Sequence, residues 1–413
     1  MSPGSKIAAR VLSLEAARAL VEQHAAELRA PTTEAVDLIS ASGRVLAEDL
    51  HADRELPPFP RATRDGYAVR AVDLAKLPAK LTVVDEVRAG AGSHRPIGTS
   101  EAAEIMTGAP VPAGADAVVM VEHTARSGER VEVQRGVASG ENIVPAGAEA
   151  RQGAVLVARG ARVGVAEIAV GAAIGKTKLR VYARPRIAVL ATGDELVPLE
   201  IAPGDSQIRN SNSYSLAAQV AAAGGDPVQL PIAPDEPERL RELLSLGLKS
   251  DLLLVSGGVS AGKYDLVEQV LQEFAAEFLF AGAEIQPGRP AVFGRATAGE
   301  HTTYFLGLPG NPLSTMVTFE LFARPLIEAL SGTQPSKLVF MQARLARDVI
   351  VKTGLRQFLP AALSGDFDRA EVTPVAWQGS GDLAAAARAN CYLVVPPERG
   401  GLKAGEMVSV MLK

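Results

Sequence analysis

Three short apolar runs, each broken by a turn of small residues, constrain the fold of the middle of this chain. They occupy residues 187–195 (IAVLATGDE), 252–265 (LLLVSGGVSAGKYD) and 304–312 (YFLGLPGNP). Each begins with the continuous hydrophobic stretch that a parallel strand buried on both faces requires. Because ligands bind beyond the carboxyl ends of the strands in an open α/β sheet, these turns are expected to form the functional site.

Composition narrows the class of protein before any motif is considered. The 413 residues suggest roughly two to four domains. A net charge of −5 and an aromatic content of 4% argue against nucleic acid as a partner, since it needs a basic field and stacking surfaces. The sequence contains no run of about eighteen apolar residues, so no membrane span is predicted. No signal-peptide pattern is found, and the only cysteine, Cys391, predicts a buried thiol in a reducing cytoplasm.

The spacing of strands, helices and turns divides the sequence into parts. Residues 1–50 and 146–180 are expected to form an N-terminal helical and linking domain, with Ser13 as the N-cap of its first helix. Short runs separated by Gly and Pro predict a β-rich lobe over 51–145. An α/β domain over 181–331 and a small all-β domain over 332–413 follow. Helices of the α/β domain are predicted at 211–223, 237–248 and 312–330.

The glycine-rich turn after the second apolar run has the composition of an anion-binding loop. Gly257 and Gly258 allow the backbone to approach a ligand, while Ser256 and Ser260 add hydroxyl donors. Lys263 adds a positive charge near a helix start. A plain strand-to-helix turn would also use two glycines, but the combination with Ser and Lys favours phosphate.

Carboxylates follow two of the runs and precede one predicted helix. Asp194 and Glu195 end the first motif, Asp265 lies beyond the glycine turn, and Asp235 stands before the helix at 237. Carboxylates facing a phosphate repel it unless a cation intervenes, so the pattern predicts Mg²⁺. Asp235 could instead be only an N-cap, and Asp194 with Glu195 only a solvated turn.

Further stiff loops carry charged or hydroxyl side chains. Residues 287–290 place Arg289 between prolines, which would hold its guanidinium toward an oxyanion. Residues 57–67 combine arginines, an acid and aromatics, and residues 106–112 form a second Pro-containing loop with Thr107. In residues 309–312, Asn311 suits an N-cap and Pro312 the first helical turn.

Taken in chain order, these segments resemble the MoeA family, the molybdopterin molybdenumtransferases, which are related to the C-terminal part of gephyrin. The resemblance covers nearly the whole chain. It rests on Asp65-Gly-Tyr-Ala68, Met106-Thr-Gly-Ala-Pro110, Gly140-Glu-Asn-Ile143, Ala191-Thr-Gly-Asp-Glu195, Ser256-Gly-Gly-Val-Ser260 with Asp265, Leu308-Pro-Gly-Asn-Pro312 and Gln378-Gly-Ser-Gly381.

The resemblance implies a multidomain α/β plus β fold. Its parts would be a central three-layer α/β domain that binds molybdopterin, a β-rich N-terminal lobe and a small C-terminal β-barrel-like domain. It also implies a homodimer that inserts molybdate into adenylylated molybdopterin. The reaction would need Mg²⁺, cleave the adenylyl phosphoanhydride and release AMP. The site would lie between the α/β domain of one subunit and the lobe of the other.

Residue roles are carried over by matching position. Catalysis is assigned to Asp65, Thr107, Glu195 and Asp265, and Mg²⁺ binding to Glu195, Asp235 and Asp265. Molybdate would contact Arg289, Pro290, Arg356 and Ser380. Substrate would contact Arg61, Arg64, Ser256, Gly257, Gly258, Ser260, Lys263, Pro309, Gly310, Asn311 and Pro312.

The chain departs from the family pattern at several of these places. Residues 59–64 read Phe-Pro-Arg-Ala-Thr-Arg where the family has Phe-Asp-Asn-Ser-Ala-Met, which makes the loop more cationic. Arg289 replaces the family's Lys and changes the donor geometry. Two other functions remain open at this point: an adenylyltransferase using the same α/β module, and a non-catalytic scaffold of the gephyrin kind.

Overall fold

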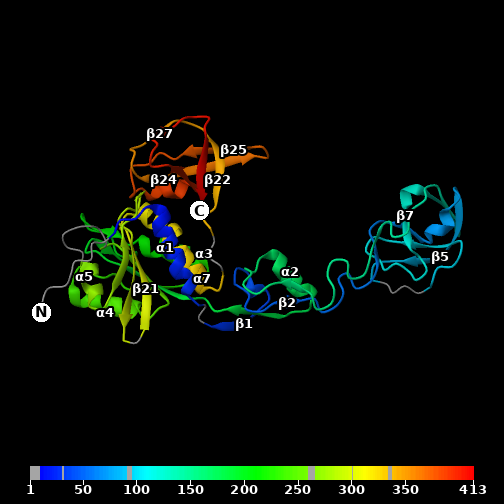
Figure 1. Cartoon of the computed structure of the whole chain (residues 1–413), viewed down its shortest axis with the longest axis horizontal. Coiled ribbons are helices and arrows are strands. Elements are labelled where there is room, and N and C mark those ends of the chain that lie inside the picture. The colour runs from blue at the N-terminus through cyan, green and yellow to red at the C-terminus, as the bar shows by residue number, and fades with distance from the viewer. Residues whose placement is uncertain (1–9, 30–31, 91–94, 259–265, 300, 334–336) are drawn as a thin grey trace.

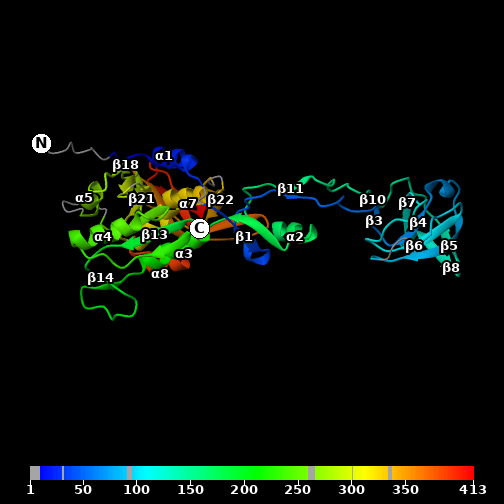
Figure 2. The ribbon, with the colours of Figure 1, turned by 90° about the horizontal axis from the view of Figure 1, so that it is seen from below.

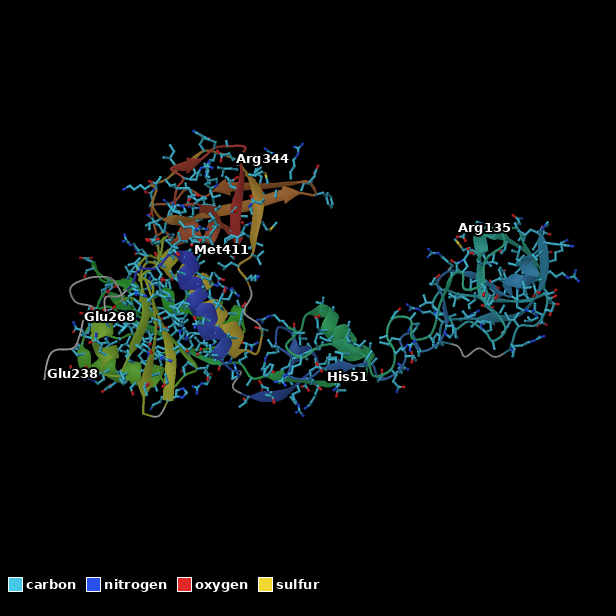
Figure 3. The ribbon with its side chains drawn as sticks, viewed as in Figure 1. His51, Arg135, Glu238, Glu268, Arg344 and Met411 are labelled. Carbon is cyan, nitrogen blue, oxygen red and sulfur yellow. The ribbon has the colours of Figure 1, made fainter. Side chains whose placement is uncertain are left out.

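The computed structural model describes residues 10–29, 32–90, 95–258, 266–299, 301–333 and 337–413. These residues form an elongated molecule, with the α/β domain and the C-terminal domain at one end and the β-rich lobe at the other (Figures 1 and 2). A narrow linking part joins the two ends. Figure 3 shows Arg135 on the lobe, Glu238 and Glu268 on the α/β domain, and His51 on the connection between them.

The α/β domain is built on a twisted sheet with the strand order β16-β13-β17-β21-β20-β18. The first four of these strands are parallel, and the last two pair antiparallel. All side chains of β17 are buried, as expected for a strand covered on both faces. The strands are β13 (Arg186–Ala191), β16 (Asp226–Gln229), β17 (Leu252–Ser256), β18 (Glu277–Ala281), β20 (Val292–Ala298) and β21 (His301–Leu308).

Helices cover both faces of this sheet. Successive strand side chains point to opposite faces, so the apolar residues of these strands need a helical layer on each side. Leu252 and Leu254 of β17 pack with one helical layer, and Leu253 and Val255 with the other. The first layer contains α1 (Leu14–Glu27), α3 (Asn212–Ala223), α6 (Pro312–Thr318) and α7 (Arg324–Leu330). The second contains α4 (Pro237–Gly247) and α5 (Leu266–Gln272). The predicted three-layer α/β domain is therefore confirmed.

Local capping chemistry explains two of the helix ends, the start of α1 and the end of α3. The Ser13 hydroxyl accepts a hydrogen bond from the Ala16 N–H at 3.2 Å and caps α1. Gly224, at φ +102°, ends α3 in the left-handed conformation that glycine favours. The helix predicted over 312–330 is interrupted by a π-helical turn, Phe319–Ala323, which carries the buried Glu320.

The linking part pairs segments from before and after the lobe. β1 (Thr33–Asp37) pairs with β12 (Lys178–Tyr182), and β2 (Leu50–His51) pairs with β11 (Val155–Val157). Helix α2 (Val165–Ala173) and the 3₁₀ turn Ile39–Ala41 complete it. Its own small core contains Leu46, Leu50, Val163, Leu179 and Val181.

The lobe is a sheet with the order β7-β4-β6-β5-β9-β8 and has apolar clusters on both faces. Its strands are β4 (Gly66–Val69), β5 (Ala79–Val87), β6 (Glu101–Ile105), β7 (Ala117–Met120), β8 (Thr124–Ser127) and β9 (Arg130–Val133). The 3₁₀ turns Ala71–Leu74 and Val121–His123 connect some of them. A ribbon of β3 (Arg61–Ala62) and β10 (Ile143–Val144) leads into the linking part.

The C-terminal domain closes into a β-barrel, because β24 pairs with both β25 and β26. Its strands are β22 (Phe340–Leu345), β24 (Arg356–Asp366), β25 (Arg369–Pro374), β26 (Cys391–Val395) and β28 (Met407–Leu412), with the short strands β23 (Val349–Ile350) and β27 (Gly401–Leu402). Helix α8 (Leu383–Arg388) is short and rich in alanine. Cys391 is fully buried in the barrel, as predicted.

Strand β19 (Ile285–Gln286) of the α/β domain pairs with β24 and so docks the barrel against that domain. Among the described residues, no helix has both the length and the apolar character needed to cross a membrane.

Candidate active site

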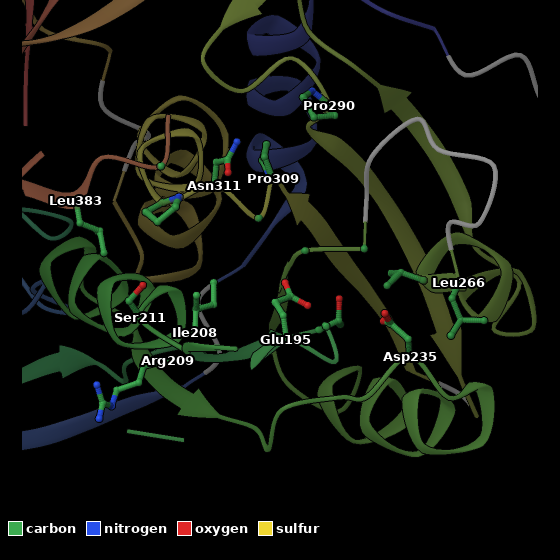
Figure 4. Close-up of a pocket in the computed structure, with 18 of the residues that line it drawn as sticks. Glu195, Ile208, Arg209, Ser211, Asp235, Leu266, Pro290, Pro309, Asn311 and Leu383 are labelled. Carbon is green, nitrogen blue, oxygen red and sulfur yellow. The ribbon is translucent and has the colours of Figure 1, made fainter. Parts of the chain in front are cut away.

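The three predicted turns lie side by side at the carboxyl edge of the sheet. Ala191 of β13 is in register with Ser256 of β17, and Ser256 with Leu308 of β21. A pocket of about 1100 Å³ opens beyond these residues (Figure 4). It is lined by Thr192, Gly193, Glu195, Ile208, Arg209, Ser211, Asp235, Gly257, Gly258, Leu266, Val267, Gln269, Pro290, Pro309, Gly310, Asn311, Pro312, Gly381 and Leu383.

Gly257 and Gly258 form part of the pocket floor in a conformation that excludes side chains. Their φ angles are +91° and +63°. A Cβ on Gly257 would lie 2.6 Å from the Thr192 carbonyl oxygen, and one on Gly258 would lie 2.5 Å from Cγ2 of Val267. The Gly257 N–H donates to the Leu308 carbonyl at 3.1 Å, so this amide holds the two turns together.

Ser256 lies below the pocket floor. It is 2% exposed, and its Oγ accepts a hydrogen bond from Asn212 Nδ2 at 2.9 Å. The side chain points to the α3 layer because it alternates with Gly257 and follows Leu252 and Leu254 on the same strand face. Ser260, Lys263 and Asp265, predicted to complete this loop, lie outside the described residues.

Two predicted carboxylates, Glu195 and Asp235, both line the pocket. Figure 4 shows both side chains pointing into the opening below Pro309 and Asn311. The Asp194 carboxylate accepts a hydrogen bond from the Asp235 N–H at 3.0 Å, which fixes the second loop beside the first. Burial, followed by the charges of Asp194 and Glu195, raises the pKa of Asp235.

Asp235 does not cap the following helix. The N-cap of α4 is Glu236, and no side-chain capping bond is formed there. The pocket-facing interpretation of Asp235 is therefore favoured over the capping one. Within the described residues, no group of three or more His, Cys, Asp or Glu side chains is arranged to hold a metal ion.

The Pro309–Pro312 turn joins the α/β domain to the C-terminal domain. Asn311 occupies the N-cap position of α6 without a side-chain capping bond. Its Nδ2 instead donates to Ser380 Oγ at 2.8 Å, and the Ser380 carbonyl accepts from the Leu313 N–H at 2.9 Å. Ser380 thus borders the pocket, which its neighbour Gly381 lines.

Two of the predicted molybdate residues, Arg289 and Pro290, lie on the loop that follows β19. Pro290 lines the pocket, whereas Arg289 and Arg356 are not among the described residues that line it. The Arg356 N–H donates to the Glu284 carbonyl at 3.2 Å, so Arg356 lies beside the same loop. Its guanidinium pairs with Glu15 of α1 at 2.7 Å.

Asp65 and Thr107 meet in the lobe. The lobe lies at the opposite end of the molecule from the pocket, so they do not reach the α/β site of their own chain (Figures 1 and 2). The Thr107 backbone N–H and hydroxyl donate to Asp65 Oδ1 and lower the pKa of Asp65. Arg61 pairs with Glu149 at 2.7 Å, and Arg64 donates to its neighbour's carbonyl at 3.3 Å.

Sequence reasoning missed the pocket residues Thr192, Ile208 and Arg209, and also Asn212, which lines a smaller cavity behind the pocket. Ile208 and Arg209 belong to β15 (Ile208–Arg209), which pairs with β14 (Leu196–Val197) across a loop with no clear strand pattern. Asn212 starts α3 and was given no role on the basis of the sequence. Its polar side chain on the buried face of a predicted helix was the available signal.

Comparison with known proteins agrees with this architecture. Residues 12–175 match the model described as MoeA N-terminal region (domain I and II). Residues 188–329 match a probable molybdopterin binding domain, and residues 342–413 match the MoeA C-terminal region (domain IV). Fold and site together define a multidomain protein organised around a molybdopterin-binding type of α/β domain.

Curated relatives and solved structures extend over nearly the full length. A protein of Bacillus subtilis named molybdopterin molybdenumtransferase is 33% identical over 92% of this chain and 90% of its own length. A protein of the same name from a Nostoc species is 35% identical over 79% of this chain and 76% of its own. The crystal structure of a molybdopterin biosynthesis MoeA protein from Pyrococcus horikoshii OT3 has a TM-score of 0.81 at 30% identity, covering 98% of this chain and 100% of that one. This chain belongs to the MoeA family, as the sequence motifs predicted.

Proposed function

We propose that this chain is a transferase of molybdenum cofactor biosynthesis. It inserts molybdate into adenylylated molybdopterin, cleaves the adenylyl phosphoanhydride and releases AMP. The proposal is carried by one observation in a member of this family: the carboxylates of Glu195 and Asp235 share a pocket wall with the glycine turn at Gly257 and Gly258. Backbone groups close to a ligand suit phosphates, and the acids suit a cation that accompanies them.

Mg²⁺ fits the residues that are present. The pKa of Asp235 is raised by burial and by two neighbouring negative charges, and a cation would relieve this repulsion. Glu195 and Asp235 would hold the ion, with Asp265, outside the described residues, as a further ligand. When bound, the ion supplies positive charge to the phosphoanhydride oxygens.

Molybdate is the second substrate and would bind where the two domains meet. Pro290 and Gly381 line this side of the pocket, and the Asn311–Ser380 hydrogen bond holds its two halves together. Arg289 and Arg356 border the same loop and supply positive charge for a dianion. Arg289 replaces a family lysine, so a planar guanidinium would offer two donors where an ammonium offers a point charge.

The working assembly is proposed to be a homodimer with shared sites. Asp65 and Thr107 cannot complete the pocket of their own chain, because the elongated shape holds the lobe away from it. Exposed apolar side chains lie both beside Asp65 in the lobe and at the pocket. In the lobe they are Met106 and Val121, with exposed fractions of 40% and 49%, and at the pocket Ile208 and Leu383, with 58% and 41%. Burying these faces against each other would bring the lobe of one copy over the pocket of another.

Two rival functions make different predictions. An adenylyltransferase would release pyrophosphate from ATP and molybdopterin without a need for molybdate. The N-terminal and C-terminal regions matched by the MoeA models speak against a protein that needs only the α/β module. A non-catalytic scaffold would have no use for the pocket-facing carboxylates of Glu195 and Asp235.

An AMP-release assay tests the proposal. The purified chain is incubated with adenylylated molybdopterin and Mg²⁺, with and without molybdate, and AMP is quantified by chromatography. Molybdate-dependent AMP release is expected, with a large loss in the Glu195→Gln and Asp235→Asn variants. In a second assay with ATP and molybdopterin, pyrophosphate release that needs no molybdate would instead identify an adenylyltransferase. A folded protein that is inactive in both assays would support the scaffold function.

A further inference from the structure

A single side-chain amide lies beneath the pocket and connects two of its glycine-containing turns. Asn212 is the first residue of α3. Its Nδ2 donates to the Gly310 carbonyl at 2.7 Å and to Ser256 Oγ at 2.9 Å. Thr315 Oγ1 lies 3.4 Å from the same nitrogen. The contacts therefore reach the end of β17, the turn after β21 and the start of α6.

The orientation of this amide is fixed by its surroundings. The Gly310 carbonyl can only accept a hydrogen bond, so the NH₂ group must face it. The Asn212 Oδ1 is buried and has no hydrogen-bond partner within the described residues. A buried acceptor left unpaired is unfavourable, which makes Asn212 a poor choice for a residue that merely starts a helix. The two hydrogen bonds that its Nδ2 donates offset the cost of the unpaired Oδ1.

The segments held by Asn212 are in direct contact above it. A Cβ on Gly310 would lie 3.7 Å from Cα of Gly257, and the Gly257 N–H bonds to the Leu308 carbonyl. Both glycines line the main pocket, whereas Asn212 lines only a smaller cavity of about 60 Å³ behind it. Asn212 is thus placed to act on the pocket without touching what binds there.

We infer that Asn212 is a positioning residue that sets the spacing between the Gly257–Gly258 turn and the Pro309–Pro312 turn. This inference rests on the proposed function for its catalytic readout. Loss of the amide lets the two turns separate, so the phosphoanhydride is held out of line with the acidic wall at Glu195 and Asp235. Small displacements of this kind reduce turnover strongly, because bound reactants leave their reactive alignment.

The chain offers a closely matched control on the same helix. Gln219 also carries a buried amide, and its Nε2 donates to the Met316 carbonyl at 3.2 Å and to Glu320 Oε1 at 2.8 Å. Its Oε1, like Oδ1 of Asn212, has no partner among the described residues. Gln219 connects α3 to the α6 region but contacts neither glycine turn. A purely structural role predicts the same outcome for both residues.

The experiment compares Asn212→Ala and Asn212→Asp with Gln219→Ala in the full chain. Thermal unfolding, hydrogen–deuterium exchange of peptides covering 252–258 and 304–311, and steady-state AMP release are measured. We expect all three variants to lose some stability. Only the Asn212 variants should show faster exchange in both peptides and a kcat reduced by about tenfold or more, while Gln219→Ala stays within about twofold of the parent.

The outcomes separate this inference from the proposed function. Equal exchange in the Asn212 and Gln219 variants would overturn the positioning role, whatever the activity. Faster exchange confined to the Asn212 variants, in a chain that releases no AMP, would support the positioning role and reject the proposed reaction. Unchanged kcat with faster exchange would show that the spacing of the turns does not matter for turnover and would also overturn the inference.

Discussion

Thr107 donates two hydrogen bonds to one oxygen of Asp65, from its backbone N–H at 2.6 Å and from its hydroxyl at 2.8 Å. Both bonds favour the charged carboxylate, with the backbone bond the larger cause of the lowered pKa of Asp65. The pair gives the lobe a fixed anion on an exposed loop. Because the Asp65 carboxylate is exposed on the lobe, it can contribute to a binding site only when another protein surface packs against that loop.

Removing the Thr107 hydroxyl tests how this carboxylate is kept charged. Thr107→Val retains the backbone bond and loses the hydroxyl bond, so the pKa of Asp65 should rise toward its ordinary value. Because a lowered folded-state pKa stabilises the fold above the unfolded pKa and this stabilisation is lost as pH falls, the variant should also lose less stability on acidification. The acid limb of the AMP-release profile should move to higher pH, and Thr107→Ser should restore it.

Complementation tests whether the site is shared between copies. Asp65→Ala and Glu195→Ala should each be inactive alone. When the two are unfolded and refolded together at equal amounts, half of the dimers carry both chains and one of their two sites is intact, so about a quarter of the parent activity should return. Mixing Asp65→Ala with the double variant Asp65→Ala/Glu195→Ala should restore none. Absence of rescue in the first mixture would contradict a shared site.

Removing the charge of Asp235 should have opposite effects on two quantities: the stability of the protein without Mg²⁺ should rise, and the stabilisation by Mg²⁺ should be lost. The pKa of Asp235 is raised, so in the folded state its charged form is disfavoured and stability increases as pH falls toward that pKa. Asp235→Asn should therefore raise the Tm modestly at neutral pH and flatten its pH dependence. Mg²⁺ at about 100 times its Kd would add about 2.7 kcal/mol to the parent protein. Calorimetry should find this gain absent in the variant.

The ion pair between Arg356 and Glu15 gives a direct test of the molybdate assignment. Glu15 competes with an incoming dianion for the guanidinium, which it contacts at 2.7 Å. Glu15→Gln should lower the KM for molybdate about two- to threefold, a change typical of an exposed pair. Arg356→Ala should raise that KM by about tenfold or more. If both variants leave the KM unchanged, Arg356 does not contact molybdate.

The glycine turn should tolerate no side chain. Gly257→Ala places a Cβ 2.6 Å from the Thr192 carbonyl oxygen at a φ of +91°, so backbone strain and a steric clash combine. We expect a loss of about 2–4 kcal/mol in the free energy of unfolding. Gly43 is the matched control: its φ is +76°, but a Cβ added there has no atom within 4 Å, so only the backbone strain remains and the clash is absent. Gly43→Ala should cost only about 1–2 kcal/mol, as measured by denaturant titration.

Sequence patterns predicted the features that depend on local periodicity. The apolar runs ending at Ala191, Ser256 and Leu308 became adjacent parallel strands, because buried strands and turn residues leave a strong local signal. Alternation along β17 would also have placed Ser256 on the strand face of Leu252 and Leu254, away from the main pocket.

Other features depend on contacts between distant segments and left no such signal. The hydrogen bonds of Asn212 span about 44 to 103 positions of sequence, and short-range patterns do not report such contacts. The distance between the lobe and the pocket depends on the direction of the linking part. Family motifs implied that Asp65 works with Glu195, and a single chain holds them at opposite ends.

The double crossing of the linking part has a mechanical consequence. The chain leaves through β2 and returns through β11, and these two short strands pair beside a small core of their own. The lobe is therefore attached to the rest of the chain through a narrow two-stranded ribbon, and Asp65 lies beyond this ribbon, between β3 and β4. Because the lobe extends away from this ribbon, a small rotation at the ribbon moves Asp65 by a larger distance, so the stiffness of the β2–β11 pairing limits how far Asp65 moves relative to the pocket of its own chain.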